Sequence, residues 1–460
     1  MSPAPAATAI RDALPPGGLF ADQHWRISPT PFALGPELAK ELETFGRVLL
    51  QFYRAVNLLY RQSVAGKQPA WVAELLDQGK PAELIELQRS NTFKNELPRV
   101  LRPDCLLTET GLAISELDSV PGGIGLTAWL NQTYANVLPA SRWKDSEEEV
   151  PAQFRRQDAG GTLIGGERGM LEGFAGIFGD APRVHIIVSE ESASYRPEME
   201  WLAIELNRTG RSTFNVQHST FNAFTPGDAV YRFFELFDLA NIPSAKPLFA
   251  LAAGKKVGLT PPPKPIFEEK LLLGLLWNRN LRGFWRQELG EGFFQRLLKV
   301  VPYTWIVDPT PLPPHGAIPE LHLTDWQQLK ALSQRERDLI LKVSGYSEEA
   351  WGARGVYLGS DLSTADWSVA VDKAIASWGR SPFVLQRYHK PRVVESGYFD
   401  FETNQLVSMP GRVRLCPYYF VLGENDSARA QLGGILATIV PADKKIVHGM
   451  KDAILAPCSA

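Results

Sequence analysis

Four charged side chains within residues 101–126 have the types and spacing needed to bind a metal ion together with a phosphate. They occupy alternate positions in two strand-like runs: Arg102, Asp104, Glu116 and Asp118. Successive side chains of a strand point to opposite faces, so alternate positions share one face. Carboxylate oxygens suit a hard divalent cation such as Mg²⁺, which usually shares them with a substrate phosphate. The sequence therefore predicts a charged strand face that could bind Mg²⁺ and phosphate.

The turn between the two runs determines which of these side chains face one another. We expect a three-residue loop formed by residues 109–111, whose glycine supplies the positive φ that such loops require. That loop places Asp104 opposite Glu116 and Arg102 opposite Asp118, so the four side chains lie together on one face of a hairpin. The alternative is a solvated hairpin whose charged face binds no ligand.

A glycine-rich turn follows the hairpin at residues 121–125, Pro-Gly-Gly-Ile-Gly. Because glycine has no Cβ, we expect this backbone to approach a ligand closely.

The hairpin resembles the metal-binding hairpin of circularly permuted ATP-grasp ligases, a group that includes glutathionylspermidine-synthetase-like proteins. In that group Arg-x-Asp is followed, after eleven residues, by Glu-x-Asn and then by Pro-Gly-Gly. Here the motif reads Arg102-Pro-Asp104, Glu116-Leu-Asp118 and Pro-Gly-Gly at 121–123. The sequence departs from the family at Asp118, where asparagine is usual. Aspartate is still a good Mg²⁺ ligand, although it adds a negative charge.

A second group of candidate residues lies in the C-terminal part of the chain. Lys342 lies in an apolar run, and a buried lysine needs a partner anion. The glycine-rich stretch that follows contains Arg354 and Gly355, and such loops let backbone N–H groups approach a phosphate. Arg414 lies on a predicted strand, where an arginine suits a phosphate or a carboxylate.

Two further residues are suggested by the family resemblance. Lys270 takes the lysine position of a helix that reads Asn-Lys-Ala-Leu-Leu in the family, and Gln386 matches a glutamine in the strand that borders the adenine. The alternatives are an exposed helix charge for Lys270 and an ordinary polar strand face for Gln386.

The resemblance covers residues 95–460 and implies an α+β chain with a circularly permuted ATP-grasp fold, a small pre-ATP-grasp α/β lobe and an N-terminal helical segment. In unpermuted ATP-grasp enzymes the phosphate-binding lysine precedes the metal-binding carboxylates. Here the carboxylates come first and Lys342 follows them. The order of the motifs therefore agrees with the permuted topology.

The resemblance also implies an ATP-dependent carboxylate–amine ligase with ATP and Mg²⁺ as cofactors. The implied metal ligands are Asp104, Glu116 and Asp118, and the implied ATP-binding residues are Lys270, Lys342, Arg354, Gly355, Gln386 and Arg414. A substrate carboxylate would attack ATP to give an acylphosphate and ADP, and an amine would then displace phosphate to give an amide. Arg102 is the predicted catalytic residue, because it could steady the acylphosphate or its tetrahedral successor.

Two other functions remain open from the sequence. The chain could be a phosphotransferase that stops at the phosphorylated product, or a nucleotide-binding scaffold protein whose catalytic site has degenerated. The chemically competent residues at positions 104, 116, 118 and 342 argue against degeneration.

The chain is expected to divide into five segments: a disordered tail at 1–18, an N-terminal helical segment at 19–95, a permuted ATP-grasp portion with the metal hairpin at 96–180, a pre-ATP-grasp-like α/β lobe on the acceptor side at 181–260, and the ATP-grasp nucleotide-binding portion at 261–460. Within the helical segment, apolar spacing predicts helices at 36–63, 70–77 and 83–89. In the α/β lobe, a strand, a helix and a strand predict a parallel sheet. Residues 248–265 are rich in proline, glycine and lysine and are expected to form a linker.

The composition is that of an ordinary globular protein, with 44% hydrophobic and 22% charged residues. The net charge of −3 gives no electrostatic reason to expect nucleic acid or an acidic membrane as partner. The three cysteines match no zinc-binding spacing, and no secretory signal or membrane span is recognisable, so we expect a cytoplasmic protein. The expected partners are small-molecule or peptide carboxylates and amines. The sequence leaves their identity and the oligomeric state open.

Overall fold

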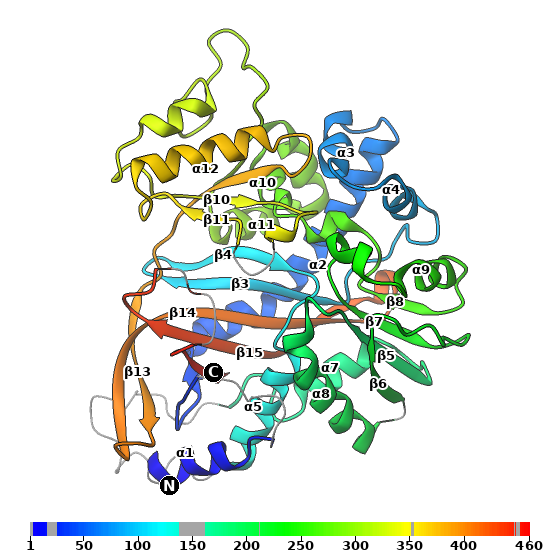
Figure 1. The fold of residues 1–460 in the computed structure, drawn as a ribbon, viewed down its shortest axis with the longest axis vertical. Coiled ribbons are helices and arrows are strands. Elements are labelled where there is room, and N and C mark those ends of the chain that lie inside the picture. The colour runs from blue at the N-terminus through cyan, green and yellow to red at the C-terminus, as the bar shows by residue number, and fades with distance from the viewer. Residues whose placement is uncertain are drawn as a thin grey trace.

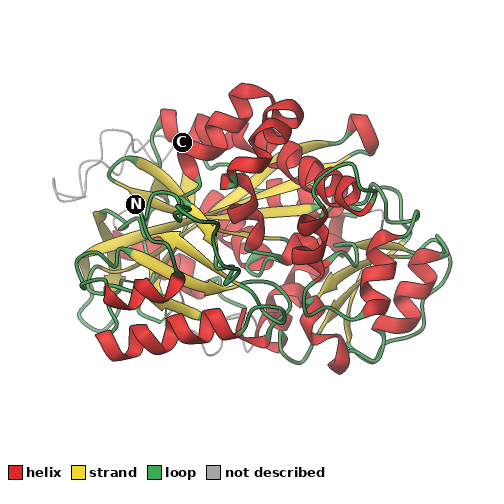
Figure 2. Cartoon of the chain, turned by 90° about the horizontal axis from the view of Figure 1, so that it is seen from above, coloured by secondary structure: helices red, strands yellow, loops and turns green. Residues whose placement is uncertain are grey.

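The computed structural model describes residues 3–15, 25–137, 162–210, 212–350, 354–445, 447 and 451–460, whose strands form three sheets (Figure 1). One sheet has eight strands, a second has four antiparallel strands and a third has four parallel strands. Helices lie over the faces of the sheets (Figure 2). The fold is therefore mixed α+β, as expected.

The large sheet joins the predicted metal hairpin to strands from the C-terminal end of the chain. Its order is β1-β16-β15-β14-β3-β4, with β13 beside β14 and β2 beside β16. The strands are β1 (Arg26–Ile27), β2 (Phe32–Ala33), β3 (Val100–Thr108), β4 (Gly111–Asp118), β13 (Val393–Asp400), β14 (Gln405–Leu422), β15 (Arg429–Pro441) and β16 (Ile454–Ser459). β3 pairs antiparallel with β14, and Leu106 lies opposite Arg414. This pairing brings the carboxylates of the hairpin close to Arg414.

The antiparallel sheet carries two of the predicted nucleotide-binding residues. Its order is β11-β10-β12-β9, formed by β9 (Thr304–Ile306), β10 (Leu339–Val343), β11 (Val356–Leu358) and β12 (Phe383–Arg387). Helix α12 (Thr364–Ala376) packs against it, with Trp367 in the same buried cluster as Leu341 and Leu385. The strands predicted around Lys342 and Gln386 are therefore confirmed, and they are neighbours in one sheet.

The parallel sheet confirms the predicted strand–helix–strand unit. It has the order β6-β5-β7-β8, formed by β5 (Arg183–Val188), β6 (Thr213–His218), β7 (Ala229–Phe233) and β8 (Gly258–Thr260). Helices α5 (Ile124–Val137), α7 (Gly169–Gly176) and α8 (Arg196–Thr209) share a buried cluster with one face, and α9 (Ala245–Ala253) shares one with the other. The prediction of a linker at 248–265 is wrong, because α9 and β8 occupy it. The range also includes the first residue of a 3₁₀ helix, Pro265–Glu268.

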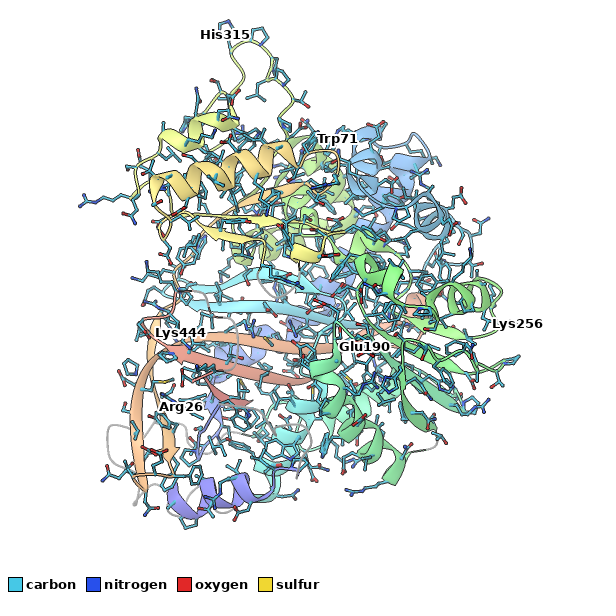
Figure 3. All side chains as sticks on the ribbon, in the orientation of Figure 1. Arg26, Trp71, Glu190, Lys256, His315 and Lys444 are labelled. Atoms are coloured by element: carbon cyan, nitrogen blue, oxygen red, sulfur yellow. The ribbon has the colours of Figure 1, made fainter. Side chains whose placement is uncertain are left out.

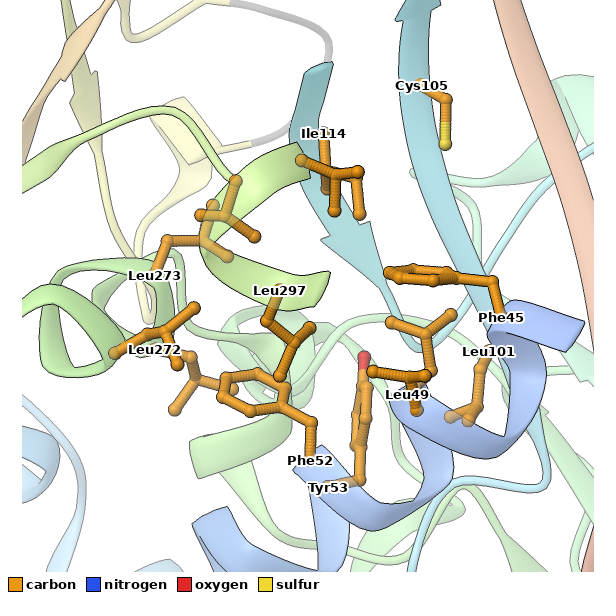
Figure 4. Packing of buried hydrophobic residues seen from close by; sticks show 14 of the residues in the cluster. Phe45, Leu49, Phe52, Tyr53, Leu101, Cys105, Ile114, Leu272, Leu273 and Leu297 are labelled. Atoms are coloured by element: carbon orange, nitrogen blue, oxygen red, sulfur yellow. The ribbon is translucent and has the colours of Figure 1, made fainter. Parts of the chain in front are cut away.

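The N-terminal helical segment forms as expected, with α2 (Pro36–Val64), α3 (Ala70–Asp77) and α4 (Ala82–Arg89). Its longest helix, α2, packs its apolar side against the large sheet and against α10 (Leu271–Trp277) and α11 (Arg282–Val300). Figure 4 shows Phe52 of α2 beside Leu272 and Leu297, in the same buried cluster as Leu101 of β3. The segment is therefore part of the main hydrophobic core.

The expected disordered tail at 1–18 is wrong for residues 3–12, which form helix α1 (Pro3–Asp12). Ala6, Ala7 and Ile10 are buried, because α1 packs against α5 and the large sheet. Residues 1, 2 and 16–18 of that range lie outside the described residues. Among the described helices, none combines the length and the apolar character needed to cross a bilayer.

Candidate active site

The predicted facing pairs of the hairpin are confirmed: Asp104 lies opposite Glu116, and Arg102 lies opposite Asp118. The predicted loop is wrong, because Thr108 pairs with Gly111 and the connection has two residues. A two-residue loop shifts the register by one position. A β-bulge then inserts one extra residue opposite the junction of positions 104 and 105 and restores the predicted pairing.

The extra residue of the bulge is Ser115, and its carbonyl oxygen accepts a hydrogen bond of 2.7 Å from Lys342 Nζ. A bulged residue is left out of the strand ladder, so its backbone oxygen is available to another partner. Lys342 Nζ also donates to Gln386 Oε1 at 2.9 Å, and Gln386 Nε2 donates to Thr304 Oγ1 at 3.0 Å. The bulge therefore links the hairpin directly to the predicted phosphate-binding lysine.

Each of the three predicted metal-binding carboxylates is paired with a basic side chain. Arg102 lies between two of them, with Nε 3.0 Å from Asp104 Oδ1 and Nη2 2.9 Å from Asp118 Oδ2. Arg414 Nη1 lies 3.1 Å from Asp104 Oδ2, and Lys270 Nζ lies 2.7 Å from Glu116 Oε1. The structure thus brings together a cluster of alternating charges on the predicted face.

This charge alternation shifts the ionisation of the two aspartates in opposite directions. Burial alone would raise the pKa of Asp104, but the guanidinium groups of Arg102 and Arg414 outweigh it and lower the pKa. Burial raises the pKa of Asp118, and the carboxylates of Asp104 and Glu116 raise it further, against the lowering effect of Arg102. Asp118 is therefore the carboxylate that an additional cation would stabilise most in its charged form.

The two lysines also differ in their ionisation. Burial lowers the pKa of Lys342 from 10.5 to about 8, because its nearest acceptors are a neutral carbonyl and an amide oxygen. Burial also lowers the pKa of Lys270, but the adjacent Glu116 carboxylate outweighs this effect and raises it. An anionic ligand such as a phosphate would therefore favour the charged form of Lys342.

A pocket lies between the hairpin, β10, β12 and the C-terminal segment. Five of the predicted site residues line it: Asp104, Glu116, Lys342, Gln386 and Arg414. Pocket residues outside the predicted set add further basic and aromatic groups: Arg387, Tyr388, His389 and Lys445. Arg102 and Lys270 adjoin the pocket through ion pairs with its lining. The site therefore combines carboxylates and basic groups from two sheets.

The remaining two predicted residues lie away from this cluster. Arg354 forms an ion pair with Glu191, in the loop that follows β5. Gly355 is buried: its N–H donates to the carbonyl of Glu349, its carbonyl accepts from the N–H of Val343, and a Cβ would collide with the Val343 side chain. Its absence of a side chain is thus explained by packing, and the structure shows no phosphate-facing role for it.

The donor set suits Mg²⁺, although the side chains are not gathered around one point. In the described ranges, no group of three or more His, Cys, Asp or Glu side chains is arranged to hold a metal ion. The positively charged side chains of Arg102, Lys270 and Arg414 neutralise the carboxylates instead of a metal ion. The metal assignment of Asp104, Glu116 and Asp118 therefore stays a prediction, supported by their hard oxygen donors and by the raised pKa of Asp118.

The glycine-rich turn after the hairpin is packed against tyrosines, contrary to the expectation of an open approach for a ligand. A Cβ at Gly122 would collide with the ring of Tyr195, and one at Gly123 would lie 2.5 Å from the hydroxyl of Tyr418. Tyr418 Oη also donates to the carbonyl of Gly122 at 2.7 Å. These glycines therefore let the α/β lobe and the large sheet close tightly around the turn.

Sequence reasoning missed Glu198, a buried carboxylate in the first turn of α8 that contacts the start of α5. Its two oxygens accept the N–H groups of Gly123 and Leu126 at 2.7 and 3.0 Å. Burial raises its pKa to about 7, against the lowering effect of these two bonds. Nothing near position 198 in the sequence indicates this contact, since the partner residues lie 72 and 75 positions away.

The carboxyl ends of the parallel strands face this turn. Figure 3 labels Glu190, which follows β5 at the end toward the large sheet, and Lys256, which precedes β8 at the opposite end. Tyr195 and Glu198, which contact the turn, follow β5 as well. Ligands of parallel α/β sheets bind outside the carboxyl ends of the strands. The predicted acceptor side therefore adjoins the charged hairpin.

No protein-family model matches the sequence, and no curated protein matches it significantly. Among solved structures, a glutathione synthetase-like effector from Globodera pallida in its apo form covers 99% of this chain and 96% of its own, with a TM-score of 0.55 and 12% identity. A putative gamma-glutamylcysteine synthetase from Methylobacillus flagellatus covers 94% of this chain and 89% of its own, with a TM-score of 0.38 and 11% identity. At these identities the first likeness establishes a shared fold, and the second is too weak to support an argument.

Proposed function

We propose that this chain is an ATP-dependent carboxylate–amine ligase of circularly permuted ATP-grasp topology. The observation that carries the proposal is the pocket in which Asp104 and Glu116 of the hairpin face Lys342 and Gln386 of a different sheet. Carboxylates opposite a buried lysine are what a triphosphate with its metal ion requires. The likeness to a structure described as glutathione synthetase-like is consistent with this reaction class.

The basic residues of the pocket would bind and orient the nucleotide. Lys342 and Arg414 would neutralise phosphate oxygens, and Gln386 would hold Lys342 in place through its 2.9 Å hydrogen bond. Arg102, fixed by two aspartates, would hold the acylphosphate while the amine attacks. When Mg²⁺ is bound by Asp104, Glu116 and Asp118, it would neutralise charge on the phosphates.

The strand pairing supports the permuted topology. β3 and β4, which carry the carboxylates, belong to the same sheet as β13–β16 from the C-terminal part of the chain. A permuted ATP-grasp chain would place its metal-binding strands early and complete their sheet with late ones. The acceptor carboxylate and amine would enter from the side of the parallel sheet, beside Tyr195 and Glu191.

The test is thermal unfolding with a non-hydrolysable ATP analogue, with and without Mg²⁺, for the native chain and for Glu116→Gln. A ligand at about 100 times its dissociation constant stabilises the folded state by about 2.7 kcal/mol. We expect stabilisation that depends on Mg²⁺ and is weaker in Glu116→Gln, followed by ADP release in a screen of acids with amines. Absence of any nucleotide-dependent shift would contradict the proposal.

A nucleotide-binding protein without catalysis is the second candidate. It is favoured by the ion pairs that all three carboxylates already form with basic side chains of the protein. Stabilisation by the nucleotide that does not depend on Mg²⁺, with no ADP release for any pair of acid and amine, would support this candidate. Sustained ADP release that needs no amine would instead indicate a phosphotransferase.

A further inference from the structure

The N-terminal helical segment and the residue that follows it, Glu96, make several buried polar contacts with one short stretch of the chain, residues 264–271. That stretch contains Lys270, whose Nζ lies 2.7 Å from Glu116 of the hairpin. It has little regular structure, since only Pro265–Glu268 forms a 3₁₀ turn before α10 begins. A stretch with few hydrogen bonds of its own must be held in place by its neighbours.

The first contact is an ion pair between Lys80 and Glu269, the residue directly before Lys270. Lys80 Nζ lies 2.5 Å from Glu269 Oε1, and the two side chains are 1% and 0% exposed. Two buried charges are stable together only when their geometry is well defined, and either one alone would be strongly unfavourable. This ion pair therefore fixes the position of the backbone next to Lys270.

Two further contacts hold the same stretch. Gln88 Oε1 accepts the N–H of Ile266 at 3.2 Å. Lys264 Nζ donates to the carbonyls of Phe93 and Glu96, both at 3.1 Å, and to the side-chain oxygen of an asparagine in α2. Because Lys264 is 1% exposed, these three oxygens replace the water that its ammonium group would otherwise bind.

Glu269 extends this connection to the other predicted phosphate-binding lysine. Ser344 Oγ donates to Glu269 Oε2 at 2.5 Å and accepts the N–H of Leu271 at 2.9 Å. Ser344 directly follows β10, two positions after Lys342. One buried carboxylate thus connects the helical segment, the start of α10 and the end of β10.

A separate link ties the stretch to the metal hairpin. Tyr53 Oη of α2 lies 3.2 Å from Ser119 Oγ, which donates to the carbonyl of Phe267 at 2.8 Å. Ser119 is the residue after Asp118. The helical segment is therefore connected to both sides of the pocket.

We propose that the N-terminal helical segment is a positioning scaffold for the nucleotide site, and that Lys80 is its principal positioning residue, acting through Glu269 on Lys270. The functional part of this inference rests on the proposed nucleotide binding, whereas the positioning part does not. The contacts converge on the stretch 264–271, which contains Lys270, and on Ser344, two positions after Lys342. A merely structural role would not require this convergence.

The experiment compares the full-length native chain with Lys80→Met, Lys80→Arg and the control Arg89→Met. Arg89 belongs to the same segment and pairs with Asp77 at 2.5 Å, but it makes none of the contacts with residues 264–271. The first measurement is backbone hydrogen exchange of a peptide spanning 264–277. The second is the affinity for adenylyl imidodiphosphate with Mg²⁺, measured at a temperature at which every variant is folded.

We expect Lys80→Met to exchange faster in 264–277 and to bind the nucleotide analogue about tenfold or more weakly, because a displaced binding group loses its productive geometry. Lys80→Arg should restore both properties, and Arg89→Met should leave both unchanged. A folded Lys80→Met chain with native exchange and native affinity would overturn the proposal. If Lys80→Met does not fold, Gln88→Met replaces it with the same expectations; this variant removes the hydrogen bond to Ile266 and a longer one, of 3.4 Å, to Asp77.

The two proposals fail in distinguishable ways. If the native chain does not bind the analogue, the proposed nucleotide site is contradicted. The hydrogen-exchange rates of the variants then test the positioning role of the helical segment by themselves. A native chain that binds it, together with equal exchange and equal affinity in all variants, contradicts the scaffold while leaving the nucleotide site supported.

Discussion

Replacing Asp104 by asparagine should destabilise this protein more than neutralising either of the other two paired carboxylates of the hairpin, Glu116 or Asp118. The carboxylate is 6% exposed and accepts from Arg102 Nε at 3.0 Å and from Arg414 Nη1 at 3.1 Å. Arg102 keeps Asp118 as a partner in the variant, so the loss falls mainly on Arg414. Among the described residues, Asp104 is the one carboxylate paired with Arg414.

Removing one partner of a buried ion pair costs about 3–5 kcal/mol, because the other charge is left uncompensated. We expect about 3 kcal/mol for Asp104→Asn, the lower end of that range, since the amide oxygen can still accept one guanidinium N–H. The assay is the urea-induced unfolding of the native and variant chains at pH 7, without nucleotide.

The matched control is Asp372→Asn, the same chemical change at an exposed ion pair with Lys330. Exposed pairs contribute about 1 kcal/mol or less, so this variant should unfold close to the native chain. Equal losses in the two variants would refute the reasoning. A double variant of Asp104→Asn with Arg414→Met should lose less than the sum of the single losses, because the uncompensated charge is removed.

Three other predictions concern single sites. Burial raises the pKa of Glu198 from 4.5 to about 7, so between these pH values the folded state keeps a proton that the unfolded chain has released. The free energy of unfolding should therefore fall as the pH rises through this window. Glu198→Gln should abolish that fall. Gly345→Ala should cost about 2 kcal/mol more than Gly379→Ala in urea unfolding, since both have positive φ but only Gly345 faces the Glu269 carboxylate, where a Cβ would collide. Arg354→Ala should change the unfolding free energy by about 1 kcal/mol or less, because its ion pair is exposed, and a larger loss would contradict that view.

The hairpin shows which part of the site local sequence could predict. Alternation of side chains along a strand depends on the backbone alone, so the shared face of Arg102, Asp104, Glu116 and Asp118 was predictable. The bulge at Ser115 could not be predicted. The turn sequence is compatible with a loop of two or of three residues, and only the two-residue loop needs a bulge to give the predicted pairing. The predicted loop was one residue too long and the bulge was not predicted. These two errors cancelled, so the predicted facing pairs were correct.

Composition led to a wrong prediction for two segments whose secondary structure is stabilised by tertiary packing. Residues 248–265 have the glycine, proline and lysine content of a linker, yet they contain α9 and β8, because Leu248 and Phe249 bury themselves against the parallel sheet. Residues 3–12 look like a disordered tail, yet α1 forms by burying Ile10. Tertiary burial overrides weak local propensity in both cases.

The sequence by itself determined the charged face of the hairpin, the strands that carry Lys342 and Gln386, the parallel strand–helix–strand unit and the helices of the N-terminal segment. Each of these depends on periodicity or on residue type within a few positions. Only the tertiary structure decided that Arg414 neutralises Asp104, that Glu198 binds the glycine turn and that Lys80 holds Glu269. These contacts join residues that are 72 to 310 positions apart, and their strength comes from a shared low-dielectric interior that no local pattern records.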